Sequence, residues 1–284
     1  MIDYSDIIEA FKQFGPRAIA LWGSYGMGLQ DKYSHDVDIV VYVNRLPNKK
    51  TKERIFSTLS DESVPMVPLP YDGNFFSRKN EICEVVFKLC SNIESDVSGL
   101  LGGQCGCENN IAIFINYTKP LYDDGWLANQ KKKIHKYPKR LLASNLFSSL
   151  FSALRQIHYY DRGINKRKQP YWAGLCINEG LDSLIRAVFA ANKTYYGKAK
   201  WAEVQYRNFK FKPKNFERRI VGVMKSRNIR SYKHLVLDVC AMCKKHYPNE
   251  CADVVNIDSK LLEIDNYIES KKRQSIEGTA PIGK

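Results

Sequence analysis

The sequence predicts an α+β fold, in which a small domain with a mixed β-sheet is followed by an all-α helical bundle domain. Short apolar runs of β type are confined to residues 1–130. From residue 142 onward, leucines recur at four-residue steps, which is a helical spacing. The net charge divides in the same way, at −5 for residues 1–130 and +19 for residues 131–284. We therefore expect one domain at 1–130, a second at 131–272 and a flexible tail at 273–284.

In the first domain, the strands are expected where β-branched and other apolar residues cluster between polar turns. Ile111–Ile115 is apolar enough for a further strand, and residues 120–126 read as a turn that closes the domain. A loop that contains Pro65, Pro68 and Pro70 precedes the strand that we expect at 82–89. The full expected order is a helix at about 4–13, strands at 18–24 and 36–43, a helix near 51–60, and the strand at 82–89.

In the second domain, the period of the apolar residues is that of a helix. Leu142, Leu146, Leu150 and Leu154 define the first long helix. A second helix at about 173–192 carries its apolar residues on one face. Further helical stretches are expected near 215–225, 231–246 and 258–272.

Two acidic residues in one strand are the most informative feature. Gly23-Ser24 ends an apolar run, and 11 residues separate Ser24 from Asp36, which stands two positions before Asp38. Residues two apart on a strand point to the same face, so the two carboxylates must lie together. Burying like charges side by side is costly without a cation. Oxygen ligands suit Mg²⁺, with Mn²⁺ as an alternative, and such an ion shares its other positions with phosphates.

A third acidic residue is expected on a later strand. Glu84 has apolar neighbours on both sides in Ile82-Cys83-Glu84-Val85-Val86, so it lies within a strand, and such a position needs a functional reason. Glu81, near the start of that strand, is the alternative, and alternation puts it on the other face. We favour Glu84.

These pieces resemble the signature of the DNA polymerase beta-like nucleotidyltransferase superfamily. The resemblance covers roughly residues 15–90 and implies an enzyme that transfers a nucleoside monophosphate from an NTP, with ATP as the first choice, and releases pyrophosphate. It implies that Gly23 and Ser24 hold phosphates, and that Asp36, Asp38 and Glu84 are catalytic residues and metal ligands. Glu84 either completes a second metal site or accepts the proton of the attacking hydroxyl group.

The order of the domains also resembles the small antibiotic-type nucleotidyltransferases that act on aminoglycosides or lincosamides, in which a helical domain helps to bind the acceptor. We therefore expect a small hydroxylated acceptor. The basic second half would repel a polycation, so an aminoglycoside fits less well than a lincosamide. The alternatives are transfer to RNA, transfer to a protein side chain, and a non-catalytic nucleic-acid-binding protein on the same fold.

The segment 195–219 interleaves aromatic and basic residues, a composition typical of nucleic-acid contacts but also of a solvated basic face with core aromatic residues. The apolar stretches are too short to span a bilayer, so no membrane association is expected. The N-terminus lacks the features of a signal peptide, and eight cysteines then indicate reduced thiols in the cytoplasm. A homodimer is compatible with this architecture.

Overall fold

The computed structural model describes residues 4–32, 34, 36–61, 73–78 and 81–252 of the chain. These residues divide into two compact units: unit 1 holds residues 4–141 and 195–198, and unit 2 holds 142–194 and 199–252. The predicted proline loop, the helix at 258–272 and the tail at 273–284 lie outside the described residues.

Unit 1 is built on a mixed sheet with the strand order β3-β4-β2-β1-β5. β2 and β4 are parallel, and the other neighbouring pairs are antiparallel. A parallel pair at the centre of the sheet needs cover on both faces, which the helices of unit 1 provide. The strands are β1 (Pro16–Leu21), β2 (Asp36–Val43), β3 (Gly73–Arg78), β4 (Glu81–Leu89) and β5 (Lys119–Asp123).

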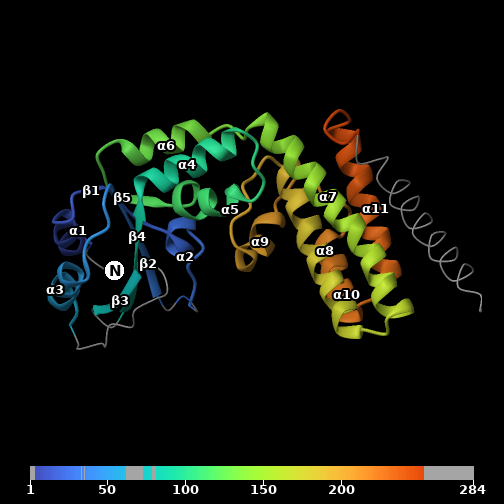
Figure 1. Cartoon of the computed structure of the whole chain (residues 1–284), viewed down its shortest axis with the longest axis horizontal. Helices are drawn as coiled ribbons and strands as arrows, with labels where there is room; N and C mark the ends of the chain where they lie inside the picture. The colour runs from blue at the N-terminus through green and yellow to red at the C-terminus, as the bar shows by residue number, and fades with distance from the viewer. Residues whose placement is uncertain (1–3, 33, 35, 62–72, 79–80, 253–284) are drawn as a thin grey trace, which may run out of the picture. The chain divides into compact units, whose positions relative to one another are not determined.

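Helices cover the two faces of the sheet (Figure 1). α1 (Ser5–Lys12) and α3 (Lys49–Leu59) pack on one face, where Ile39 and Val41 of β2 join an apolar core. α4 (Cys90–Leu101) and α6 (Trp126–Ile134) lie on the other face, where the Trp126 ring is 5.1 Å from that of Tyr42. Alternation along β2 therefore turns even-numbered residues, Asp36 and Asp38 included, away from the α1–α3 core.

Three predictions for unit 1 were wrong, and the third, that a strand ends at Ser24, is described with the site below. Ile111–Ile115 is not a strand but the end of α5 (Cys107–Ile111) and most of the π-helix η1 (Ala112–Asn116). A short buried apolar run does not distinguish the two structures by its pattern. Residues 120–126 are not a simple turn, because β5 ends at Asp123 and α6 starts at Trp126. The Asp123 carboxylate accepts the backbone N–H groups of Leu127 and Ala128, both at 2.9 Å, and so caps α6.

Unit 2 is helical, as predicted. Its long helices α7 and α8 and the later α10 and α11 match the expected stretches, and α9 was not anticipated. None of the helices in the described part of the chain has the length and apolar character needed to cross a membrane. The helical elements are α7 (Lys139–Asp161), the π-helix η2 (Arg162–Lys166), α8 (Pro170–Ala191), α9 (Ala199–Tyr206), α10 (Phe216–Ser226) and α11 (Ile229–His246).

Candidate active site

Four residues from four neighbouring chain segments form one row across the sheet of unit 1. Asp38 of β2 is paired with Glu84 of β4, and Glu84 is paired with Phe75 of β3. On the other side of β2, the backbone N–H of Trp22 donates to the carbonyl of Asp38 at 3.0 Å, which extends the β1–β2 pairing by one residue. Residues opposite one another share a face, so Trp22, Asp38, Glu84 and Phe75 all project from the same side.

Three carboxylates converge in this row. Ligand oxygens of Asp36, Asp38 and Glu84 lie within 4.8 Å of one another. Asp38 is only 8% exposed, and the other two are half-buried. Like charges this close repel one another, and burial removes the solvent that would screen them. An all-oxygen donor set of this kind fits a hard divalent cation such as Mg²⁺ or Mn²⁺.

Gly23 lies directly against the carboxylate of Asp38. Its φ of +63° is in the left-handed region that favours glycine. A Cβ atom at this position would be 1.7 Å from Oδ2 of Asp38 and 3.1 Å from its Cβ. Glycine is therefore required here twice, for the backbone conformation and for the space that the carboxylate occupies.

Ser24 is not at the end of a strand, as the sequence suggested, but in the short helix α2 (Gly23–Met27), because β1 ends at Leu21. The backbone N–H of Gly26 donates to the carbonyl of Trp22 at 3.0 Å. A Cβ atom on Gly26 would be 2.4 Å from the Tyr117 carbonyl oxygen, so α2 packs tightly on the backbone beside it. Ser24 is thus held next to Gly23, at the edge of the carboxylate cluster.

Glu81, the alternative third acidic residue, lies in different surroundings. It is opposite Arg78 in the β3–β4 pair, and its charge helps to raise the pKa values of Tyr4 and Tyr25. Burial is the main reason that the pKa of Tyr4 is raised to about 12, and the charge of Glu81 adds to it. Burial also raises the pKa of Tyr25, with Glu81 and Asp36 contributing. The structure thus brings Glu84, and not Glu81, to the two aspartates.

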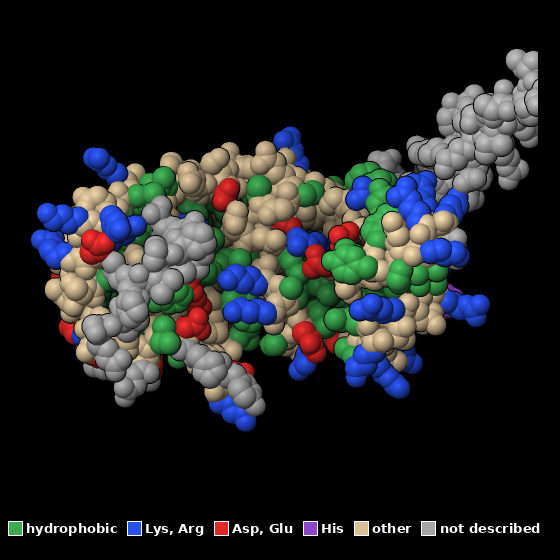
Figure 2. All heavy atoms as spheres, turned by 60° about the horizontal axis from the view of Figure 1, so that its bottom comes forward, with side chains coloured by type: hydrophobic (Ala, Val, Ile, Leu, Met, Phe, Trp, Pro, Cys, Tyr) green, Lys and Arg blue, Asp and Glu red, His purple; other side chains and the backbone are tan. Residues whose placement is uncertain are grey.

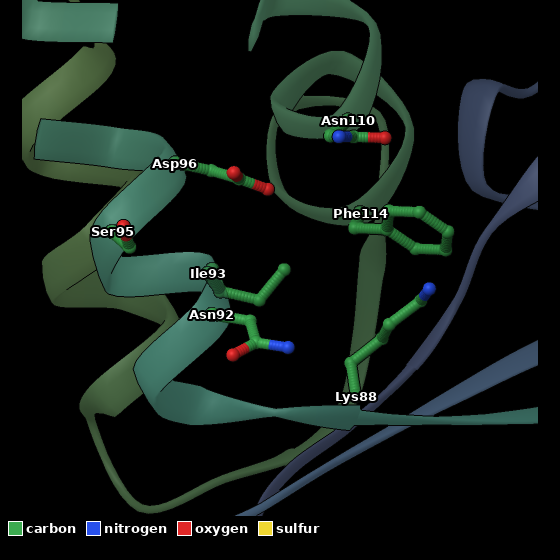
Figure 3. Close-up of a pocket in the computed structure, with 7 residues that line it drawn as sticks. All are labelled: Lys88, Asn92, Ile93, Ser95, Asp96, Asn110 and Phe114. Carbon is green, nitrogen blue, oxygen red and sulfur yellow. The ribbon is translucent and has the colours of Figure 1, made fainter. Parts of the chain in front are cut away.

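A cavity of about 360 Å³ lies between β4, α4 and the α5–η1 segment (Figure 3). In Figure 3 the side chains of Asn92, Ile93 and Asp96 reach from α4 toward Phe114, with Asn110 on the same side as Phe114. Burial raises the pKa of Asp96, and the Lys88 ammonium partly offsets this effect. Seven residues line the cavity: Lys88, Asn92, Ile93, Ser95, Asp96, Asn110 and Phe114.

This cavity adjoins the row of site residues through a stack of side chains. The Lys88 ammonium is 4.3 Å from the centroid of the Phe114 ring. The Phe114 ring lies 5.0 Å from that of Trp22, at an interplanar angle of 32°. Trp22 is opposite Asp38, and Lys88 shares the face of Glu84 four residues along β4. The Trp22–Phe114 pair thus connects the lining of the cavity to the row of site residues.

Sequence reasoning missed Trp22, Phe75 and the cavity. Trp22 directly precedes Gly23, and this position in the motif was the only available indication of its role. Phe75 belongs to β3, a strand that was not predicted, and the cavity depends on α4 and η1, which were also missed.

One comparison with known proteins agrees with this geometry. Residues 5–93 match the family model of a nucleotidyltransferase domain, and this range includes all three carboxylates. Residues 108–202 match a second family model, described as a domain of unknown function, DUF4037. The crystal structure of a nucleotidyltransferase-like protein from Exiguobacterium sibiricum 255-15 aligns with 86% of this chain and 76% of its own chain, at 10% sequence identity and a TM-score of 0.41. No curated protein matches the sequence.

Proposed function

We propose that this transferase, whose residues 5–93 form a nucleotidyltransferase domain, moves a nucleoside monophosphate from an NTP to a hydroxyl group of a small acceptor. ATP is the first NTP to test. The observation that carries the proposal is the convergence of oxygens from Asp36, Asp38 and Glu84 within 4.8 Å, beside Gly23 and Ser24.

The donor set of the three carboxylates fits Mg²⁺ or Mn²⁺, with Asp36 and Asp38 as the first ligands. Such an ion, when bound, supplies positive charge to the transferred phosphoryl group and to the leaving pyrophosphate. Ser24 contributes its hydroxyl group, and Gly23 and Ser24 contribute backbone N–H groups, as donors to the outer phosphates.

In the reaction, the acceptor oxygen forms a bond to the α-phosphorus, and the bond from that phosphorus to the bridging oxygen of the β-phosphate breaks. Pyrophosphate leaves with the electrons of the broken bond. Glu84 either accepts the proton of the acceptor hydroxyl group or joins the two aspartates as a ligand. The protein does little covalent chemistry, so the rate depends on positioning and charge.

The lining of the cavity supports a small acceptor rich in hydroxyl groups. Asp96, Asn92 and Asn110 offer hydrogen-bond acceptors, Lys88 offers a donor, and Phe114 and Ile93 offer apolar surface. The net charge of +14 on the whole chain disfavours a polycation. Figure 2 shows many Lys and Arg side chains on the visible face of the helical unit.

The test is to incubate the protein with Mg²⁺ and each α-labelled NTP, together with separate pools of hydroxylated small molecules, RNA and cell protein. We expect the label on a small molecule, with release of unlabelled pyrophosphate. Label on RNA or on protein would show that the acceptor is RNA or protein and not a small molecule. Absence of transfer to every pool, from a protein that is folded, would contradict the proposal.

Variants of the cavity test the acceptor part. Asp96→Asn and Lys88→Met should each raise the KM for the acceptor about 10-fold, because the first removes the charge from a hydrogen-bonding group and the second removes the group itself. The KM for the NTP should change less than about 2-fold. Ser91→Ala, on the exposed side of α4, is the matched control. Steady-state kinetics with the labelled acceptor gives both constants, and an unchanged acceptor KM in both variants would exclude the cavity.

A further inference from the structure

Between α8 and α9, the chain returns to unit 1 for four residues, Tyr195–Lys198. Tyr195 anchors this segment: it is only 4% exposed, and its hydroxyl group donates to the carbonyl of Ile134 at 2.7 Å. Its ring lies 4.9 Å from that of Tyr137. The hydroxyl group of Tyr117 donates in turn to the carbonyl of Tyr195. Both the side chain and the backbone of Tyr195 are therefore fixed to unit 1.

The next two residues are held by their backbone. When the side-chain oxygen and nitrogen of Asn109 in α5 are exchanged, an orientation that satisfies both atoms, its amide donates to the carbonyls of Tyr196 and Gly197 at 2.8 and 3.2 Å. Gly197 lies against the ring of Tyr117, where a Cβ atom would approach Cε2 to 3.1 Å. The segment is thus in close contact with α5 and η1 up to the residue before Lys198.

This docking determines where Lys198 lies. Its ammonium group is 4.7 Å from the centroid of the Trp22 ring. Trp22, which is 5% exposed, is the cross-strand neighbour of Asp38 on the face that carries the three carboxylates. Directly opposed residues have Cβ atoms about 5 Å apart, so the Trp22 side chain that contacts the lysine ammonium group starts beside Asp38.

A positive charge at this point has a chemical use. The three carboxylates and a triphosphate are all negatively charged, and residues 1–130 carry a net charge of −5. One divalent cation offsets only part of this charge. A lysine side chain is long and flexible and acts as a point charge for phosphate oxygens. Docking of residues 195–198 supplies such a group from a part of the sequence outside the 5–93 domain.

We propose that Lys198 binds the β- and γ-phosphates of the NTP, and that the segment Tyr195–Lys198 is an integral part of the nucleotide site. The proposal rests on the proposed function, since it assigns a further residue to the same site. The Trp22 ring supports the lysine side chain and keeps its ammonium group beside the phosphates. The ammonium group lies over the ring, 4.7 Å from its centroid, and its charge acts on the nucleotide.

Two matched variants separate the charge from the packing. Lys198→Met keeps a long apolar side chain on Trp22 and removes the charge. Lys200→Met is the control, because the Lys200 ammonium has a similar contact, 4.5 Å from the Trp201 ring centroid, and the residue is exposed. The Kd of a non-hydrolysable ATP analogue, measured by calorimetry with Mg²⁺, should rise about 10- to 100-fold for Lys198→Met, as for loss of a charge-assisted hydrogen bond. It should not change for Lys200→Met, and Lys198→Arg should retain most of the affinity.

The number of phosphates provides the second measurement. The loss of affinity in Lys198→Met should be largest for the triphosphate and negligible for the monophosphate, because only the outer phosphates would contact the ammonium group. An equal loss for both nucleotides would indicate a structural role and overturn the proposal. So would an unchanged Kd for the triphosphate. A wild-type protein that binds no NTP would instead refute the proposed function itself, so the two failures are distinguishable.

Discussion

Replacing Asp38 with asparagine should abolish nucleotidyl transfer. The substitution keeps the size of the side chain but removes a charged oxygen from the cluster of three carboxylates. A bound metal ion stabilises the charge of the transition state by several kcal/mol. A loss of about 4 kcal/mol corresponds to roughly a 10³-fold lower kcat/KM. The measurement is the rate of release of labelled pyrophosphate from a γ-labelled NTP in the presence of acceptor.

Stability measurements distinguish loss of function from loss of folding in this variant. Without Mg²⁺, Asp38→Asn should melt at the same temperature as the wild type or higher, because it relieves repulsion among the three carboxylates. Added Mg²⁺ should stabilise the wild type and have a smaller effect on the variant. Asp6→Asn, at an exposed ion pair with Arg78, is the control and should retain full activity. Wild-type turnover in Asp38→Asn would refute the metal assignment.

Replacing Gly23 with alanine should also inactivate the enzyme, for a steric reason. The new Cβ atom would fall 1.7 Å from Oδ2 of Asp38, so the carboxylate must turn away from Asp36 and Glu84. We expect at least a 100-fold loss of kcat, since misplacing a catalytic group by about 1 Å can cost that much. The release of labelled pyrophosphate measures kcat, and thermal melting shows whether the variant is folded.

Gly28→Ala is the matched control for this variant. Gly28 has a similar φ, +68° against +63° for Gly23, but a Cβ atom added to Gly28 would have no atom within 4 Å. Both variants should lose about 1 kcal/mol or more of unfolding free energy from left-handed strain. Only Gly23→Ala should also lose catalytic activity. Equal activity in the two variants would show that the contact between Gly23 and Asp38 is not needed.

The shared face of Asp36 and Asp38 could be predicted because it depends on a local rule, whereas the pairing of Glu84 with Asp38 depends on the register of β2 and β4. Alternation puts Asp36 and Asp38 on one face whatever the sheet contains, and the same rule separates Glu84 from Glu81. The match of residues 5–93 to a nucleotidyltransferase domain confirms the resemblance that these residues carry. The resemblance to antibiotic-type enzymes, the acceptor and the domain limits at 130 and 272 stay predictions.

Other features of unit 1 could not be read in this way, because they depend on contacts between distant segments. β3 and β5 are edge strands, and the short apolar run at 111–115 suits a helix or a strand equally until its packing is known. The segment 195–219 was interpreted either as a nucleic-acid contact or as a solvated basic face with core aromatic residues. The structure divides it, because Tyr195–Lys198 docks on unit 1 while α9 belongs to unit 2.

By itself, the sequence determined the reaction class, the order of a mixed-sheet domain and a helical domain, and the three acidic residues. The domain order and the shared face of the aspartates follow from spacing and periodicity, which act over a few residues, and the reaction class follows from the resemblance of the motif. Only the tertiary structure decided that Trp22 lies beside Asp38 and that a polar cavity lies near Trp22. It also decided that Lys198, 176 positions later in the chain, contacts the Trp22 ring. Such contacts arise from strand register and buried hydrogen bonds between elements far apart in sequence, which no local pattern records.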